Sequence, residues 1–188
     1  MGLKIKSEHL NGLLVFEPQV IQDERGFFME SFKASEFEQF RLPVNYVQDN
    51  HSRSLKNVLR GMHFQWDKPQ GKLIRVTVGS ALVVEVDIRH NSSTLGNNFS
   101  IELSAENMNI LWVPPGFANG FLALSDYVEM QYKCTAEWNR DGEGSIRWND
   151  PQLNIQWNVD KPVISDKDNS APTLNEWLSK EESKLFRV

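Results

Sequence analysis

The segment Leu82-Val83-Val84-Glu85-Val86-Asp87-Ile88 is rich in β-branched residues and is followed by the polar residues Arg89-His90-Asn91-Ser92-Ser93. β-Branched side chains suit the pleated surface of a sheet, so this stretch predicts a mostly buried strand that leaves its sheet after Ile88. Similar short apolar runs with turn residues between them occupy residues 13–16, 26–32, 73–78, 81–88, 99–103, 110–113, 121–124 and 128–134. This rhythm predicts a β-sandwich or barrel rather than alternating βαβ units.

Two stretches have a helical pattern, residues 33–40 and a tail of about residues 173–185. In the tail, Thr173 and Glu176 have the spacing of a capping box before the apolar pair Trp177-Leu178. The chain of 188 residues contains no internal repeat, linker or low-complexity segment. A chain of this length predicts a single domain over residues 1–188.

The charge pattern argues against a broad surface for binding nucleic acid or an anionic membrane. Twenty basic and twenty-five acidic residues give a formal net charge of −5, without a block of like charges. We therefore expect neither nucleic-acid nor membrane binding, and an anionic ligand would need a local pocket. The single cysteine, Cys134, cannot close an internal disulfide, and no apolar stretch approaches the roughly 20 residues of a membrane span. We expect a soluble cytoplasmic protein.

Chemically useful side chains gather in Leu59-Arg60-Gly61-Met62-His63-Phe64-Gln65 and in Gln70-Gly71-Lys72, on two consecutive strand-like segments. His63 can act as a base near neutral pH, Lys72 as a fixed cation, and the planar guanidinium of Arg60 as a clamp for an anion. On one regular strand Arg60 and His63 would point to opposite faces, unless the chain bends at Gly61. An arbitrary strand histidine is more often structural than catalytic, but these neighbours favour chemistry.

Three further motifs are Gln22-Asp23-Glu24-Arg25-Gly26-Phe27-Phe28-Met29-Glu30, Gln48-Asp49-Asn50-His51-Ser52 and Trp112-Val113-Pro114-Pro115-Gly116-Phe117-Ala118-Asn119-Gly120-Phe121. Together with the segments around His63 and Lys72, they make the chain resemble the dTDP-4-dehydrorhamnose 3,5-epimerase family from about Phe16 to Leu174. The resemblance implies a mainly β, cupin-type jelly roll (double-stranded β-helix) with short peripheral helices. It also implies a homodimer that exchanges N-terminal strands.

The resemblance implies roles for individual residues. His63 would remove a proton next to the ketone of a sugar nucleotide, Asp168 would orient its ring, with Asp166 as the fallback, and Lys72 would stabilise the enolate oxygen. The substrate-binding residues carried over are Arg25, Phe28, Glu30, Gln48, Asn50, Arg60, Asn119, Tyr132 and Glu143.

Two positions depart from the family pattern. The resemblance places Trp138 where we expect the catalytic tyrosine of the family, and an indole cannot donate a proton as an acid near neutral pH. Tyr132 or water is the alternative donor. Asn119 stands where the family motif has histidine, and an amide can neither charge nor shuttle protons. The sequence thus predicts an epimerase that inverts only one of C3 and C5, with a weak preference for C3.

No cofactor is expected. The histidines His9, His51, His63 and His90 include no His-x-His pair, so a cupin metal shell is hard to assemble and we predict a metal-free site. A Gly-x-Gly-x-x-Gly fingerprint for a dinucleotide is also absent.

Two alternative functions remain from the sequence. A sugar-nucleotide 3,4-ketoisomerase would use a similar base, but Gln65 stands where those enzymes usually carry a second histidine. A non-catalytic sugar-nucleotide-binding cupin would not need His63, Lys72 and Asp168 together, so retention of all three disfavours it.

Overall fold

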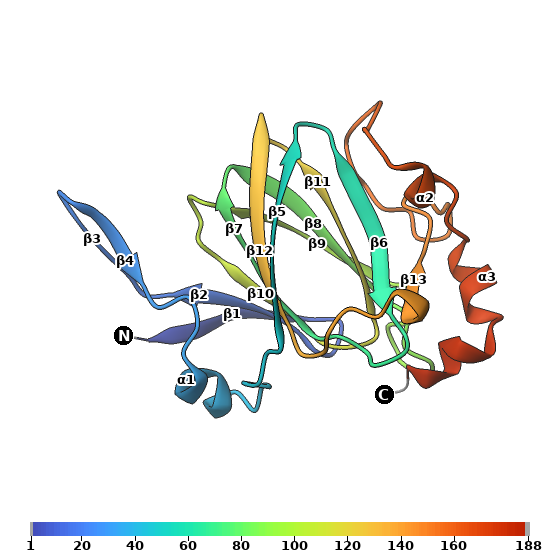
Figure 1. Ribbon diagram of the computed structural model, residues 1–188, viewed down its shortest axis with the longest axis horizontal. Helices are drawn as coiled ribbons and strands as arrows, with labels where there is room; N and C mark the ends of the chain where they lie inside the picture. Colours follow the sequence, from blue (N-terminus) through green and yellow to red (C-terminus); the bar gives the residue numbers. More distant parts are fainter. Residues whose placement is uncertain (1, 187–188) are drawn as a thin grey trace.

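Two antiparallel β-sheets face each other in the computed structural model, which describes residues 2–186 (Figure 1). One sheet has the strand order β1 (Leu3–His9), β2 (Leu13–Pro18), β10 (Ile110–Val113), β7 (Lys72–Val78), β12 (Tyr127–Cys134) and β5 (Gln48–Leu55). The other has the order β13 (Glu143–Ser145), β6 (Leu59–Gln65), β11 (Phe117–Ala123), β8 (Ser80–Asp87) and β9 (Asn98–Ser104). The predicted mainly β class is confirmed.

The central strand β8 buries both of its faces, which explains its nearly continuous apolar sequence. Val83 belongs to the core between the two sheets, together with residues of β2, β7, β10, β11 and β12. Val84 and Val86 point the other way and pack under the C-terminal segment, against residues such as Trp157 and Trp177. The alternating faces of β8 therefore separate an inner core from an outer one.

The outer face of the six-stranded sheet is covered by α1 (Ala34–Gln39), which lies within the predicted helix 33–40. Phe37 of α1 packs against Phe16, with ring centroids 5.4 Å apart. The strand predicted at 26–32 is shorter, because Phe32 leaves the sheet and its ring packs against Phe37 and Tyr46. Strand β5 was not predicted, because its residues, QDNHSRSL, show no apolar alternation. It forms a strand by pairing with β12.

The predicted C-terminal helix is two short helices, α3 (Leu174–Leu178) and the 3-10 helix η2 (Glu181–Leu185). The capping box of Thr173 and Glu176 is confirmed, since each side chain bonds the backbone N–H of the other residue. The helix stops at Ser179, whose hydroxyl donates to the Glu176 carbonyl, and Lys180 is extended. The sequence also missed α2 (Asp166–Asn169), while η1 (Arg140–Gly142) precedes β13. Within residues 2–186, no helix has the length and apolar character to cross a membrane.

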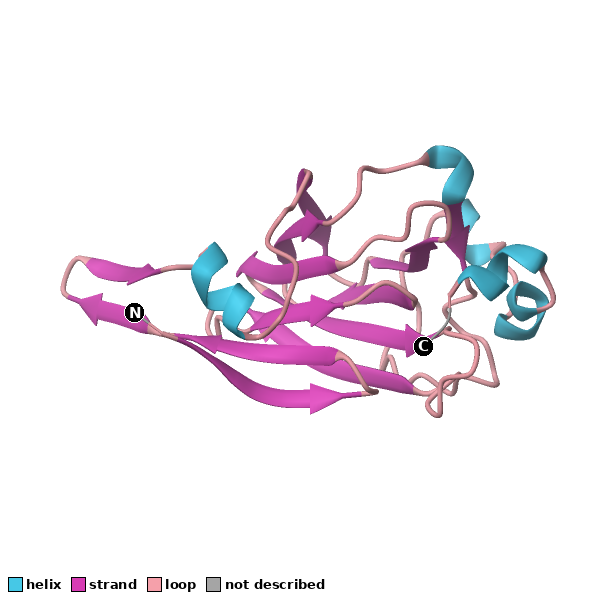
Figure 2. Cartoon of the chain, turned by 90° about the horizontal axis from the view of Figure 1, so that it is seen from below, coloured by secondary structure: helices cyan, strands magenta, loops and turns pink. Residues whose placement is uncertain are grey.

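The hairpin of β3 (Val20–Asp23) and β4 (Gly26–Met29) projects away from the two sheets (Figures 1 and 2). It carries the exposed apolar side chains Ile21, Phe27 and Phe28. Large apolar side chains clustered on a projecting element are typical of an interaction surface.

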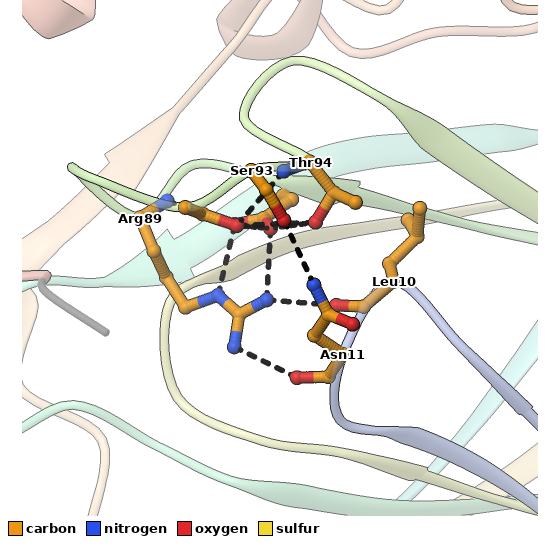
Figure 3. Close-up of polar contacts among 7 residues, drawn as sticks. Leu10, Asn11, Arg89, Ser93 and Thr94 are labelled. Atoms are coloured by element: carbon orange, nitrogen blue, oxygen red, sulfur yellow. Dashed lines mark hydrogen bonds and ion pairs between the residues drawn. The ribbon is translucent and has the colours of Figure 1, made fainter.

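The turn between β1 and β2 is clamped to the end of β8 by Arg89 (Figure 3). The Arg89 guanidinium donates to the carbonyl oxygens of Leu10 at 2.8 Å and Asn11 at 3.2 Å, and to the buried carboxylate of Asp87. Burial alone would raise the pKa of Asp87, but hydrogen bonds from Arg89 and from the hydroxyls of the neighbouring loop hold its pKa below the usual value. The clamp thus fixes β1 and β2 to the sheets of their own chain.

Candidate active site

His63 on β6 meets Asp168 on α2 at the rim of the inner core. The ring Nε2 lies 2.6 Å from Asp168 Oδ1, and the Gly61 N–H donates to Oδ2 at 3.2 Å. Burial alone would raise the pKa of Asp168, but these hydrogen bonds and the charge of His63 hold its pKa below the usual value. Asp168 is therefore held as an anion, in a position where it can orient the His63 ring. Asp166, the alternative from the sequence, is exposed.

The backbone bends at Gly61, as Arg60 and His63 require if they are to share one site. Gly61 has φ +124°, a conformation that favours glycine, and a Cβ there would lie 2.6 Å from Gly120 Cα on β11. Arg60 and His63 consequently line the same hollow, next to Asp168. Arg60 is held in place by a hydrogen bond from its Nε to Ser54 Oγ at 2.9 Å.

His63 also borders a second hollow, a cavity of about 100 Å³ that opens between the two sheets. This cavity contains seven of the site residues predicted from the sequence, together with Phe64, Gln65 and Gln70. The seven are Gln48, Asn50, His63, Lys72, Tyr132, Trp138 and Glu143. The structure thus brings together, from five strands and a loop, side chains that are distant in the sequence.

Lys72 and Tyr132 lie on neighbouring strands and share the wall of this cavity. The Lys72 ammonium is 5.9 Å from the centroid of the Tyr132 ring. Within residues 2–186, Lys72 forms no ion pair with a carboxylate, so its charge is available to a ligand. Gly71 lets the chain pass close to Trp112, because a Cβ at Gly71 would lie 2.5 Å from Trp112 Cη2. Burial raises the pKa of Tyr132, so its hydroxyl stays protonated at neutral pH.

Trp138 lies at the mouth of the cavity and is 55% exposed. Its backbone N–H donates to Gln48 Oε1 at 2.7 Å, and Gln48 Nε2 donates to Asn50 Oδ1 at 3.0 Å. Glu143 borders the same cavity and pairs with Lys167, whose Nζ lies 2.5 Å from Glu143 Oε2. The rim is thus held by polar contacts between the loop of Trp138, β5, β13 and α2.

Asn119 does not line this cavity but lies behind it, paired across the sheet with His63 on β6 and with Glu85 on β8. Its Nδ2 donates to Glu85 Oε1. Sequence analysis missed Glu85 as a candidate site residue. The available signal was a single acidic residue with apolar neighbours inside a strand, because a buried carboxyl is costly without a compensating role.

The structure does not bring Arg25, Phe28 and Glu30 to the cavity of their own chain. Arg25 pairs with Asp23 at the tip of the projecting hairpin, and Phe28 is 59% exposed. Glu30 follows the hairpin, and its carboxylate lies 3.5 Å from the Lys33 ammonium. These three residues therefore lie outside both hollows that His63 borders.

Within the described part of the chain, no cluster of three or more His, Cys, Asp or Glu side chains has the geometry to hold a metal ion. The chemistry that the described residues support is proton transfer, with a histidine base, a fixed cation and a buried phenol around one cavity.

Known proteins resemble this chain in sequence and in structure. The family model for dTDP-4-dehydrorhamnose 3,5-epimerase matches residues 7–176. The dTDP-4-dehydrorhamnose 3,5-epimerase of Salmonella typhimurium is 49% identical over 169 residues, which cover 88% of this chain and 92% of the relative.

Two solved structures are also similar. RmlC of Legionella pneumophila, a dTDP-6-deoxy-D-glucose-3,5-epimerase in complex with dTDP-4-keto-L-rhamnose, has a TM-score of 0.91 at 42% identity, covering 98% of this chain and 97% of its own. A double mutant of ChmJ, a 3'-monoepimerase from Streptomyces bikiniensis in complex with dTDP, has a TM-score of 0.86 at 29% identity, covering 98% and 90%. From its sequence and its cupin-type fold alike, this chain belongs to the dTDP-4-dehydrorhamnose 3,5-epimerase family.

Proposed function

We propose that this protein inverts both carbons next to the ketone, C3 and C5, of a dTDP-linked 4-keto-6-deoxy sugar, by proton transfer without a cofactor. The observation that carries the proposal is the His63–Asp168 contact beside the cavity that Lys72 and Tyr132 line. The Salmonella relative bears the name of a 3,5-epimerase and the Legionella structure contains dTDP-4-keto-L-rhamnose, which supports this substrate class.

Proton removal would begin at His63. Its Nε2 is bonded to Asp168, so in the neutral ring this nitrogen carries the hydrogen and Nδ1 has the free lone pair. Nδ1 takes the proton from the carbon next to the ketone, and the electrons of the C–H bond move into the carbonyl group to form an enolate. Lys72 stabilises the enolate oxygen, while Asp168 stabilises the imidazolium.

We assign Tyr132 as the donor that returns a proton to the opposite face of the enolate. Its ring is packed against the inner core, and burial keeps the hydroxyl protonated. ChmJ supports this assignment, because the histidine and tyrosine substituted in its double mutant are separated by nearly the same chain length as His63 and Tyr132. The phenolate left behind regains a proton from solvent, to which the His63 imidazolium releases its own, so that both groups return to their starting state.

Trp138 would then have a binding role. Its indole is largely exposed at the mouth of the cavity and has no acidic proton, so we propose that it forms an apolar wall against the bound substrate. The expectation of a single inversion depended on Trp138 as a defective donor. With Tyr132 as the donor, the parts needed for both inversions are present, and we propose a 3,5-epimerase.

We propose that the active form is a homodimer in which the hairpin of β3 and β4 reaches the cavity of the partner chain. The projecting hairpin supports this arrangement, since its exposed aromatic residues have no cover in their own chain. Arg25 would bind phosphate oxygens and Phe28 would stack on the nucleotide base. Arg60, Gln48 and Asn50 would bind the nucleotide from the other chain, whose His63 acts on the sugar.

One experiment tests this function. The purified protein is incubated with dTDP-4-keto-6-deoxyglucose in deuterated water and followed by proton NMR. We expect deuterium at C3 and C5 and inversion at both carbons. Movement of the ketone to C3 would instead identify a ketoisomerase, and binding without any exchange would identify a non-catalytic cupin.

We further propose a cytoplasmic role in deoxysugar synthesis for cell-surface polysaccharides, including O-antigen, because the substrate is an activated sugar donor.

A further inference from the structure

Glu85 is a fully buried carboxyl group inside the polar end of the inner core. Along β8, Val83 belongs to the core between the sheets, so Glu85, two residues further on, points to the same side. Its exposure is 0%. Neither the proposed proton transfer nor the proposed substrate binding uses Glu85, so neither explains why this strand carries an acid.

The hydrogen bonding of Glu85 is incomplete. Oε1 accepts a hydrogen bond from Asn119 Nδ2, but Oε2 is buried and has no hydrogen-bond partner within residues 2–186. A buried carboxylate normally needs several donors, or an ion pair, to offset its lost hydration. One amide donor is too little for a stable anion, so the neutral acid is the favoured form.

One charged group near Glu85 strongly affects the ionisation of its carboxyl group. Lys72, on the opposite sheet, is the only charged side chain within residues 2–186 that acts on it appreciably. The other neighbours are neutral or already paired. They are Asn119 on β11, Phe99 on β9, His63 beyond Asn119 on β6, and Asp87 with Arg89 further along the chain. Strand β12, which contacts β8 across the core, carries Tyr132 and Cys134, and burial raises the pKa of both groups.

We propose that Glu85 is a positioning residue for epimerisation, a neutral acid behind Lys72 that leaves the Lys72 charge uncompensated for the enolate oxygen and cancels that charge when it ionises. The inference rests on the proposed role of Lys72. Asn119 Nδ2 holds the acid in place by its hydrogen bond to Glu85 Oε1, and its strand β11 lies between the strands that carry Glu85 and His63.

The arrangement predicts a specific pH response. Burial raises the pKa of Glu85 to about 8, although Lys72 and the Asn119 amide both favour the carboxylate. Below this pH the acid is neutral and Lys72 acts with its full charge. Above it, the carboxylate and the ammonium offset each other, and the enolate loses stabilisation. The loss falls on kcat rather than KM, because the enolate exists only after the substrate is bound.

The test is the pH profile of kcat for the full-length protein and for Glu85→Gln. Glutamine keeps the acceptor for Asn119 but cannot ionise, so the ratio of kcat at pH 9 to kcat at pH 7 should rise roughly tenfold over the unmodified protein. Glu129→Gln is the matched control, since Glu129 lies on the outer face of β12, paired with His51 and Arg53, and its loss should not change the ratio. An equal ratio in Glu85→Gln and the unmodified protein would overturn the proposal.

A second measurement does not depend on turnover or on the folding of the variant. Carbon-13 NMR of protein labelled at the glutamate carboxyl carbons should show one resonance that titrates near pH 8, among others that titrate in the acid range. If every glutamate titrates in the acid range, Glu85 is an anion at neutral pH and the proposal is wrong. If the substrate shows no exchange while this resonance is present, the proposed epimerase function fails but the neutral acid stands.

Discussion

His63 Nε2 lies 2.6 Å from Asp168 Oδ1, although the two residues are 105 positions apart in the chain. Asp168 reaches the histidine because α2 is placed over the end of β6, where the Gly61 N–H binds the second carboxylate oxygen. The proposed base and the acid proposed to orient it are thus brought together by contact between the sheet and the C-terminal segment. The proposed chemistry depends on both elements.

Asp168→Asn is expected to slow epimerisation by up to about 10⁴-fold, because the imidazolium loses its counter-charge and the ring loses its fixed tautomer. Single-turnover rates would measure this loss. Near-normal rates in the variant would show that Asp168 only packs against the histidine.

Asp168 also makes a prediction for stability. Its folded-state pKa lies below the usual 3.8, so its contribution is present above that pH and is lost as the pH falls through the folded-state pKa. The difference in thermal stability between the unmodified protein and Asp168→Asn should therefore shrink when the pH is lowered from 7 to about 3. A difference that does not depend on pH would contradict the assigned charge.

His63→Ala is expected to reduce solvent exchange at the carbons next to the ketone by about 10²–10⁴-fold or more, since the variant has no base. Binding of dTDP, measured by calorimetry, should be nearly unchanged and serves as the control for folding. Unimpaired deuterium exchange in this variant would remove His63 from its role.

Tyr132→Phe and Trp138→Phe form a matched pair that distinguishes the two candidate proton donors. Tyr132→Phe should retain deuterium exchange on the face of His63 but lose inversion, because no acid remains on the opposite face. Trp138→Phe keeps an aromatic wall at the cavity mouth and should mainly raise KM. NMR in deuterated water measures exchange and inversion together. The reverse pattern would restore Trp138 as the residue that limits inversion.

Mixing two inactive variants tests the exchanged hairpin. Arg25→Ala and His63→Ala should each have low activity alone, whereas co-expressed chains should regain a substantial part of it. In the mixed dimer, the chain with an intact His63 receives the intact Arg25 of its partner, which completes one site. Co-expression of His63→Ala with Asp168→Asn is the control, because both changes affect the same part of the site. If the hairpin served its own chain, the mixed dimer would stay inactive.

Arg89→Met is expected to lower the free energy of unfolding by about 3–5 kcal/mol, because it leaves the buried Asp87 carboxylate without its partner and frees the turn between β1 and β2. Urea unfolding measures the loss. The double variant Asp87→Asn with Arg89→Met should be less destabilised than Arg89→Met alone, since no buried charge remains. A larger loss in the double variant would contradict the clamp.

Much of the fold follows from local sequence patterns. The β-branched run of β8 and the alternation of the neighbouring strands predict a sandwich, because strand side chains alternate between faces with a period of two. The capping box of Thr173 and Glu176 was also readable, since its partners are three residues apart. That His63 and Lys72 line one cavity could be expected, because they lie on consecutive strands, near each other in the chain.

The remaining features depend on contacts between distant segments. The sequence indicates that the chain can bend at Gly61, but it does not show that Arg60 and His63 line the same hollow, because that depends on how closely Gly120 of β11 packs against Gly61. Nor does it show that Arg25 and Phe28 lie outside the cavity of their own chain, since that depends on where the hairpin leaves the sheet.

The chemical state of Glu85 is the clearest example of what only the tertiary structure decides. In the sequence it is one acidic residue among many. In the fold, the opposite sheet removes its water and places Lys72 within electrostatic range, while the neighbouring strand offers the single amide of Asn119. Composition and periodicity determine which residues form strands, but the pKa of a buried group is set by the solvent and charges that the packed fold leaves around it.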